Sequence, residues 1–167
     1  MNILVKKQNY VIINLTKHYK KEMLPMDISK KVDELQDAKH KLLLIIGQPG
    51  SGKSKLIRKY SEETGIPILD LDKIFTHTPN NQLMREMQNF LSTYHQKVLL
   101  LDNKKILYAK DSSIDLLAFL KELSENIIVV ATWNGKIEDG QVFHFCKDAP
   151  EDLIYSVDKE DFKYILC

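Results

Sequence analysis

Four short apolar runs constrain the fold of this chain more than any other feature. They are LLLII at 42–46, PIL at 67–69, VLLL at 98–101 and IIVVA at 127–131. None alternates between apolar and polar residues, which is typical of strands covered on both faces. Segments with helical spacing accompany them at about 53–63, 81–95 and 113–124. This alternation predicts a three-layer α/β fold with a mostly parallel central sheet.

The C-terminal part of the chain follows another pattern. After Asn134 the turn signal EDG at 138–140 is followed by the short runs VFHFC and DLIYSV. Such runs predict a short β-rich tail made of a hairpin and an edge strand. No helical lid domain is expected after the sheet.

The N-terminal part is expected to be an appendage. Residues 1–26 contain an apolar stretch at 10–15 that predicts a strand, and then the charged run KHYKKE, which indicates a solvated face. Asp27 is expected to cap a helix that runs to about Lys39. The sequence therefore predicts an N-terminal extension, 1–26, and one domain, 27–167.

Charge and cysteine content limit the class of protein. The 167 residues include 24 basic and 23 acidic side chains, so no strong overall field attracts nucleic acid; DNA stays open as a partner without being indicated. Cys146 and Cys167 lack metal-ligand spacing, which predicts reduced thiols. The N-terminus has neither a signal-peptide core nor a membrane span. We expect a soluble, cytoplasmic protein that does not bind membranes.

The octet GQPGSGKS follows the first apolar run and opens a helical segment. It fills every fixed position of G-x-x-x-x-G-K-[ST], whose backbone N–H groups cradle phosphates beside a helix N-terminus. Lys53 is expected to reach the β- and γ-phosphates, and Ser54 to offer its hydroxyl to Mg²⁺. The nucleotide-binding residues predicted here are Gly47, Gln48, Pro49, Gly50, Ser51, Gly52, Lys53 and Ser54.

A carboxylate that holds the magnesium through water is expected at the end of a neighbouring buried strand. The run VLLLD ends at Asp102, which we predict to hold Mg²⁺ together with Ser54. An aspartate that only caps the following turn is the alternative interpretation. No [NT]KxD guanine-specificity motif occurs in the sequence, so ATP is the expected nucleotide.

Asn103 stands directly after Asp102. Many P-loop ATPases with an additional strand between their two motifs have a glutamate at this place, which polarises the attacking water. A neutral amide can orient water but cannot accept its proton at neutral pH, so an effect often worth ~10²- to 10⁴-fold is missing or supplied from elsewhere. The sequence therefore predicts slow intrinsic hydrolysis.

The run 127–131 is expected to lie between the strand that precedes the octet and the strand that ends at Asp102. Thr132 and Asn134, at its polar end, would then face the γ-phosphate and sense it or hold water. A turn role for Asn134 is the alternative. Arg85 could act as an arginine finger in another subunit, although an exposed arginine on an amphipathic helix is the more ordinary interpretation.

Taken together, these residues resemble the BrxF family, small P-loop, AAA-like proteins of bacteriophage exclusion (BREX) phage-defence systems. The resemblance rests on LLLIIGQPGSGKSKLIRKYSEETGIPILDLD, VLLLDNKKILYAKDSSIDLLAFLKELSEN, IIVVATWNG and the β-rich tail, over about 28–160. It implies an ATP-binding, AAA-like core that acts with other BREX proteins in distinguishing self DNA from phage DNA. It also implies a Walker A site at Gly47, Gly52, Lys53 and Ser54, a Walker B carboxylate at Asp102 and a sensor at 132–134.

Three functions follow as hypotheses. The first is a slow or partner-stimulated, Mg²⁺-dependent ATPase in phage defence, with a homo-oligomer open. The second is a nucleotide-bound assembly module that does not hydrolyse ATP, which Asn103 makes credible. The third is a small-molecule kinase, in which Asp70 and Asp72 would hold an acceptor or magnesium, although such aspartates more often cap the next helix.

Overall fold

The computed structural model describes residues 28–109, 111–147 and 151–167. Its strands are β1 (Leu42–Gly47), β2 (Ile68–Leu69), β3 (Val98–Leu101), β4 (Ile128–Glu138), β5 (Gln141–His144), β6 (Leu153–Ser156) and β7 (Lys163–Leu166). Its labelled helices are α2 (Lys53–Thr64), α3 (Leu71–Ile74), α4 (Leu83–Ser92) and α5 (Leu116–Leu123), with 3₁₀ turns η1 (Asn80–Gln82) and η2 (Lys105–Leu107). Residues 28–34 are also helical. The expectations for residues 1–26 and Asp27 lie outside the described residues.

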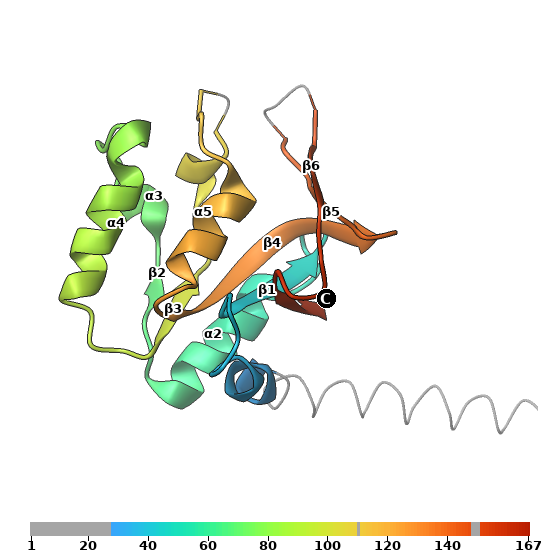
Figure 1. Ribbon diagram of the computed structural model, residues 1–167, viewed down its shortest axis with the longest axis horizontal. Coiled ribbons are helices and arrows are strands. Elements are labelled where there is room, and N and C mark those ends of the chain that lie inside the picture. Colours follow the sequence, from blue (N-terminus) through green and yellow to red (C-terminus); the bar gives the residue numbers. More distant parts are fainter. Residues whose placement is uncertain (1–27, 110, 148–150) are drawn as a thin grey trace, which may run out of the picture.

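The central sheet has the strand order β2-β3-β4-β1-β7, and every neighbouring pair in this path is parallel (Figure 1). β4 lies between β1 and β3, as the sequence predicted. Because these three strands are parallel, their carboxyl ends meet at one edge of the sheet. At that edge Gly47 pairs with Asn134, and Leu101 pairs with Ala131.

Helices cover both faces of this sheet (Figure 1). On one face Leu43 and Ile45 pack with Leu56 and Ile57 of α2 and with the helical run 28–34. This explains why β1 is apolar throughout: all six of its residues are buried. The chain is thus α/β with a mostly parallel central sheet, and its layers are compatible with a three-layer α/β fold.

The opposite face of the sheet packs against α3, α4 and α5. Leu42 and Leu44 of β1 share that core with Met87 of α4 and Leu120 of α5. Helix α5 begins at Leu116, later than expected, because the Asp115 side chain accepts a hydrogen bond from the Ala118 N–H (2.8 Å) and caps the helix. Helix α4 is also shorter than expected, since η1 precedes it and it ends at Ser92.

β4 is much longer than the run that predicted it. It continues to Glu138 and turns through Asp139 and Gly140, both with positive φ, into the antiparallel partner β5. Gly135 makes this extension feasible, since a Cβ there would lie 1.7 Å from the Phe143 carbonyl oxygen. The predicted hairpin after EDG is therefore confirmed, with β4 as its first strand.

DLIYSV forms β6, which pairs antiparallel with β5 alone, so the predicted edge strand after the hairpin is confirmed. The strand beside β1 at the edge of the central sheet is β7, which the sequence analysis did not predict. β7 has only one buried residue, Ile165, so its apolar pattern is weak. No helix occurs in residues 139–147 and 151–167. No helix of the described residues is long and apolar enough to span a membrane.

Candidate phosphate-binding site

The loop between β1 and α2 holds the octet. Gly50 and Gly52 have φ values of 81° and 102°, which favour glycine because side chains with a Cβ rarely adopt them. Gly47 is constrained differently, since a Cβ there would lie 2.4 Å from the Ser51 hydroxyl. Helix α2 begins directly after Gly52, which offers no side chain to cap the first N–H groups. Those groups and the positive end of the helix dipole favour an anion here.

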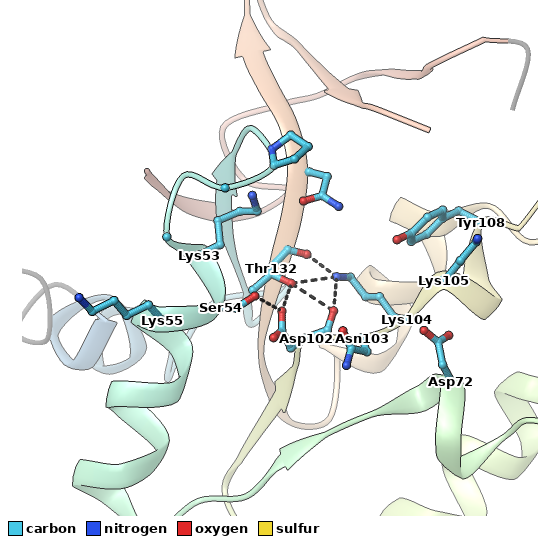
Figure 2. A pocket seen from close by; sticks show the side chains of 14 residues that line it. Lys53, Ser54, Lys55, Asp72, Asp102, Asn103, Lys104, Lys105, Tyr108 and Thr132 are labelled. Carbon is cyan, nitrogen blue, oxygen red and sulfur yellow. Dashed lines mark hydrogen bonds between the residues drawn. The ribbon is translucent and has the colours of Figure 1, made fainter. Parts of the chain in front are cut away.

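A cavity of about 530 Å³ opens beside this loop at the carboxyl edge of the sheet (Figure 2). Four parts of the chain form its wall: the loop with the start of α2, the start of α3, the segment from the end of β3 to Tyr108, and the end of the part of β4 that pairs with β1. The lining residues are Pro49, Gly50, Gly52, Lys53, Ser54, Lys55, Asp72, Asp102, Asn103, Lys104, Lys105, Tyr108, Thr132 and Asn134. Five residues of the octet line this cavity together with all five residues predicted to act on the nucleotide, whereas Gly47, Gln48 and Ser51 are not among its lining residues.

Lys53 is the first residue of α2 and is buried. Its ammonium folds back on the loop and donates to the Gln48 carbonyl oxygen (2.6 Å) and the Ser51 hydroxyl (3.4 Å). Burial lowers its pKa, and the negative charge of Asp102 acts in the opposite direction. The side chain is therefore held over the loop by two neutral acceptors, which an anionic oxygen could replace.

Asp102 connects the loop to the end of β4. Its Oδ1 accepts hydrogen bonds from the Ser54 hydroxyl (3.1 Å) and the Thr132 hydroxyl (2.9 Å) (Figure 2). Magnesium prefers oxygen ligands at ~2.1 Å in an octahedron, so adjacent ligands lie about 3.0 Å apart. The Ser54 and Asp102 oxygens are at that separation. Ser54 and Asp102, the two residues predicted to hold the magnesium, therefore lie close enough together to hold one ion.

Lys104 is a buried cation at this site that the sequence analysis missed. Its ammonium donates to the Thr132 carbonyl oxygen, to the Asp102 carbonyl oxygen (3.3 Å) and to the Thr132 hydroxyl (3.4 Å). Burial lowers its pKa to about 8, against the opposing charges of Asp102 and Asp72. A lysine in a polar stretch after a strand gives no signal that its side chain turns inward, because two of its three acceptors are atoms of Thr132 on another strand.

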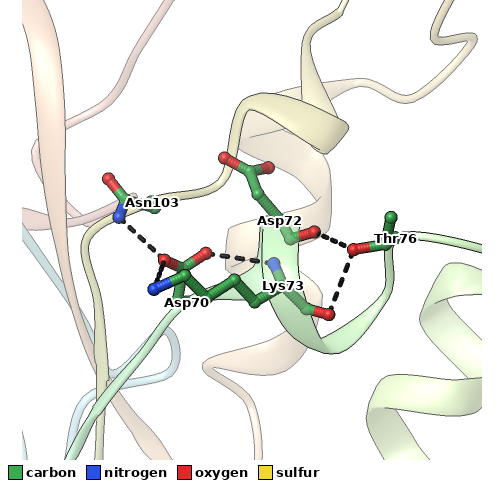
Figure 3. Close-up of polar contacts among 5 residues, drawn as sticks. All are labelled: Asp70, Asp72, Lys73, Thr76 and Asn103. Atoms are coloured by element: carbon green, nitrogen blue, oxygen red, sulfur yellow. Dashed lines mark hydrogen bonds and ion pairs between the residues drawn. The ribbon is translucent and has the colours of Figure 1, made fainter.

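Asn103 is exposed, and its side chain is already bonded within the protein (Figure 3). The amide nitrogen donates to Asp70 Oδ2 (2.9 Å). Asp70 Oδ1 accepts the Lys73 N–H (3.1 Å), so Asp70 caps α3 as the ordinary interpretation expected. The hydrogen bond from Asn103 is the main reason why the pKa of Asp70 is lowered.

Asp72 does not share the capping role of Asp70. Its Oδ1 accepts the Ile106 N–H (2.7 Å) and thereby ties α3 to η2. Asp72 lines the cavity on the side of Lys105 and Tyr108, whereas Asp70 is not among the lining residues. The two aspartates therefore connect the start of α3 to the segment after β3, Asp70 through the Asn103 side chain and Asp72 through the Ile106 N–H.

The remaining predicted residues are divided between the cavity and the surface. Thr132 and Asn134 both line the cavity, and the backbone of Asn134 pairs with Gly47 in the sheet. Trp133 between them points away into the core and is fully buried. Arg85 is exposed on α4 and contacts Gln82 (3.3 Å) and Glu86 (3.4 Å), so it takes no part in this site within the described chain.

Comparison with known proteins identifies no relative of this chain. No protein-family model matches it, and no curated protein and no solved structure matches it significantly. Function therefore has to be argued from the geometry of the site and from the sequence motifs.

Proposed function

We propose that the chain is a P-loop NTPase of the additional-strand, AAA-like type, which binds ATP with Mg²⁺ in the cavity and hydrolyses it slowly. The observation that carries this proposal is the convergence of the glycine loop, the Lys53 ammonium and the Ser54–Asp102 pair at one edge of the sheet. A polyphosphate needs backbone donors, a cation and oxygen ligands for its magnesium. The position of β4 between β1 and β3 also supports the proposal.

Each residue has a separate role in this proposal. The loop 47–54 binds the phosphates through its N–H groups, and Lys53 exchanges its bonds to Gln48 and Ser51 for phosphate oxygens. Ser54 and Asp102 hold the magnesium. Bound ATP supplies the phosphoanhydride bond that is broken, and Mg²⁺ offsets the charge that develops on its oxygens. Thr132 keeps Asp102 oriented through the hydrogen bond to Oδ1.

Slow turnover follows from Asn103. A neutral amide orients water without taking its proton, so the chain lacks at this position the base that speeds hydrolysis. We therefore propose that turnover depends on a partner. The resemblance to the BrxF family points to other BREX proteins as partners in phage defence, with duplex DNA and a second copy of the chain as further candidates.

The test measures ATP affinity and turnover of the purified chain alone and with added partner proteins or duplex DNA. Lys53→Ala is expected to abolish ATP binding. Lys59→Ala is the matched control, since Lys59 lies on the same helix and its exposed ammonium pairs with Glu63 (3.9 Å). Equal ATP affinity in the two variants would refute the proposed site, and turnover of several per second by the chain alone would refute slow hydrolysis.

A nucleotide-bound assembly module is the second candidate function. Asn103 favours it, because a neutral amide lines the cavity at the position where a base would act. The two functions differ in what Asp102→Asn does. If Lys53→Ala abolishes complex formation and Asp102→Asn does not, assembly without hydrolysis is the better description. A kinase is less favoured, because Asp70 is already committed to the cap of α3.

A further inference from the structure

Asp70 and Asn103 form a pair that fixes more than the start of α3. The Asn103 amide nitrogen donates to Asp70 Oδ2 (2.9 Å), and the Asn103 carbonyl oxygen accepts the Leu71 N–H (2.8 Å). The other oxygen of Asp70 accepts the Lys73 N–H, and the Lys73 ammonium lies 3.5 Å from Oδ2. Both partners are therefore held in place, Asp70 by the helix that it caps and Asn103 by its backbone.

This pair determines which atom of the Asn103 amide faces the cavity. An ionised carboxylate can only accept hydrogen bonds, so the amide group must present its NH₂ to Asp70. The amide oxygen then lies on the side away from Asp70 (Figure 3). Asn103 lines the cavity and Asp70 does not. The atom that Asn103 offers to the cavity is therefore a hydrogen-bond acceptor.

We propose that Asp70 is a positioning residue, which holds the Asn103 amide so that its oxygen accepts a hydrogen bond from the water that attacks the terminal phosphate. This inference rests on the proposed ATP hydrolysis and adds to it a residue outside the motifs. The hydrogen bond to a carboxylate also polarises the amide and strengthens its oxygen as an acceptor. Asp70 thus supplies part of the negative charge that is missing at position 103, without taking a proton. The water oxygen bonds to the terminal phosphorus as the bond from that phosphorus to the bridging oxygen of the β-phosphate breaks, and the water proton passes to an oxygen of the terminal phosphate.

Asp70→Asn tests the orientation because it retains the helix cap. Asparagine caps helices as well as aspartate does, so its oxygen is expected to keep the bond to the Lys73 N–H. Its NH₂ then faces Asn103, which must turn its own oxygen towards residue 70 and its NH₂ towards the cavity. We expect turnover to fall about tenfold or more, with ATP affinity changed less than twofold.

Exchange of the pair is the second variant. In Asp70→Asn with Asn103→Asp, the amide of residue 70 donates to a carboxylate at residue 103, whose other oxygen faces the cavity. Turnover is expected to return to at least the wild-type rate. Asp115→Asn is the matched control, because Asp115 caps α5 through the Ala118 N–H (2.8 Å) and does not line the cavity. It should leave turnover within twofold of wild type.

A measurement in the absence of nucleotide tests the orientation of the Asn103 amide independently of hydrolysis. The side-chain ¹⁵N–¹H signals of Asn103, assigned by their loss in Asn103→Asp, should shift as Asp70 is titrated with acid, and this shift should be absent in Asp70→Asn. Signals that do not follow the titration would overturn the proposal, as would wild-type turnover in Asp70→Asn or no recovery in the exchanged pair. A wild-type chain that binds ATP and hydrolyses none, with every partner, would instead refute the proposed hydrolysis.

Discussion

The Lys104 ammonium is buried beside the cavity, and burial disfavours its charged form. Desolvation of an ammonium is costly unless hydrogen bonds compensate. Here the ammonium has three acceptors, and all belong to Asp102 and Thr132 at the ends of β3 and β4. The lysine therefore joins two strands and places a second cation, beside Lys53, next to the region proposed for the phosphates.

Lys104→Met is expected to weaken binding of Mg²⁺-ATP about tenfold, which corresponds to ~1.4 kcal/mol. The methionine fills similar space but removes the positive charge and leaves the Asp102 and Thr132 carbonyl groups without this donor. Isothermal titration calorimetry measures the affinity, with Lys59→Met on the exposed face of α2 as the control. Unchanged affinity in Lys104→Met, with native circular dichroism, would contradict a role for this charge in binding.

Single residues of the site were predictable where chemistry restricts neighbouring positions. A phosphate loop needs glycines, a lysine and a hydroxyl at fixed spacing, so the residues from Gly47 to Ser54 could be selected from sequence, and the structure lines a cavity with most of them. Lys104 could not be selected as part of the site, and the sequence indicates Asp70 only as a kinase residue or a helix cap, not as a partner of Asn103. Their roles depend on which atoms of other strands lie beside them, and no spacing encodes that.

At the scale of elements, the β4–β5 hairpin is built around close backbone and ring contacts. Trp133 donates from its indole nitrogen to the Phe143 carbonyl oxygen (2.9 Å), and its ring lies edge-on to that of His144 at 4.9 Å. Tyr108 also packs against His144, and the centroids of these two rings are 4.4 Å apart. Tyr108, which follows η2 and lines the cavity, is therefore packed against β5 of the hairpin.

Gly135→Ala is expected to destabilise this hairpin by about 2–3 kcal/mol or more, since the added Cβ would lie 1.7 Å from the Phe143 carbonyl oxygen and the strands would have to separate. Urea unfolding measures the free energy of unfolding. Gly140→Asn is the control, because asparagine tolerates the left-handed conformation at φ 73° and nothing lies within 4 Å of the added Cβ. Equal stability of the two variants would contradict this account of β4.

His144 makes the stability of the hairpin depend on pH. Burial, aided by the charge of Lys104, lowers its pKa to about 4, whereas the unfolded chain has a histidine pKa of about 6.5. A lowered pKa means that its contribution is fully present above pH ~6.5 and is lost as pH falls towards 4, because the unfolded state binds the proton first. The difference corresponds to on the order of 3 kcal/mol.

The free energy of unfolding, measured from pH 7.5 to pH 4, should therefore decline more steeply in the wild type than in His144→Phe. Phenylalanine retains ring contacts with Trp133 and Tyr108 and cannot be protonated. His95→Gln, at an exposed position, serves as the control and should follow the wild-type profile. Parallel profiles of the wild type and His144→Phe would show that His144 does not bind a proton on unfolding in this range.

Strands were predictable from sequence when both faces are buried, as in β1 and β3, where every residue is apolar. β7 could not be placed in this way, because three of its four residues are exposed and its partner β1 lies over a hundred residues earlier. The extension of β4 beyond Ala131 was missed for a related reason. It depends on cross-strand contacts at Gly135 and Trp133, which a one-dimensional pattern does not contain.

At the scale of the whole molecule, the order of the strands creates the site. β1 leads into α2 on one face of the sheet, whereas α3, α4 and α5 cover the other face. In open α/β sheets ligands bind outside the carboxyl ends of strands where successive connections go to opposite faces. The loop after β1 and the ends of β3 and β4 meet at this place, which explains why residues almost 90 positions apart line one cavity.

Since the site joins several elements, Mg²⁺-ATP should stabilise the fold as a whole. A ligand at a hundred times its dissociation constant stabilises the native state by ~2.7 kcal/mol, which for a chain of this size raises the melting temperature by roughly 5–10 °C. Differential scanning fluorimetry with increasing Mg²⁺-ATP measures this shift. It should disappear in Lys53→Ala, since the loop then lacks its cation.

Measurements with and without Mg²⁺ distinguish the phosphate-binding residues of this site from the residues that hold the ion. In the Asp102→Asn variant, the amide oxygen can still accept the hydrogen bonds from Ser54 and Thr132. The variant without ligand should therefore melt near the wild-type temperature. Its carboxylate charge is gone, however, and Mg²⁺ binds neutral amides more weakly than carboxylates. The melting shift with ATP in EDTA should therefore be the same in both proteins, while the additional shift on adding Mg²⁺ should be smaller in Asp102→Asn. An equal magnesium-dependent shift in both would place the ion elsewhere.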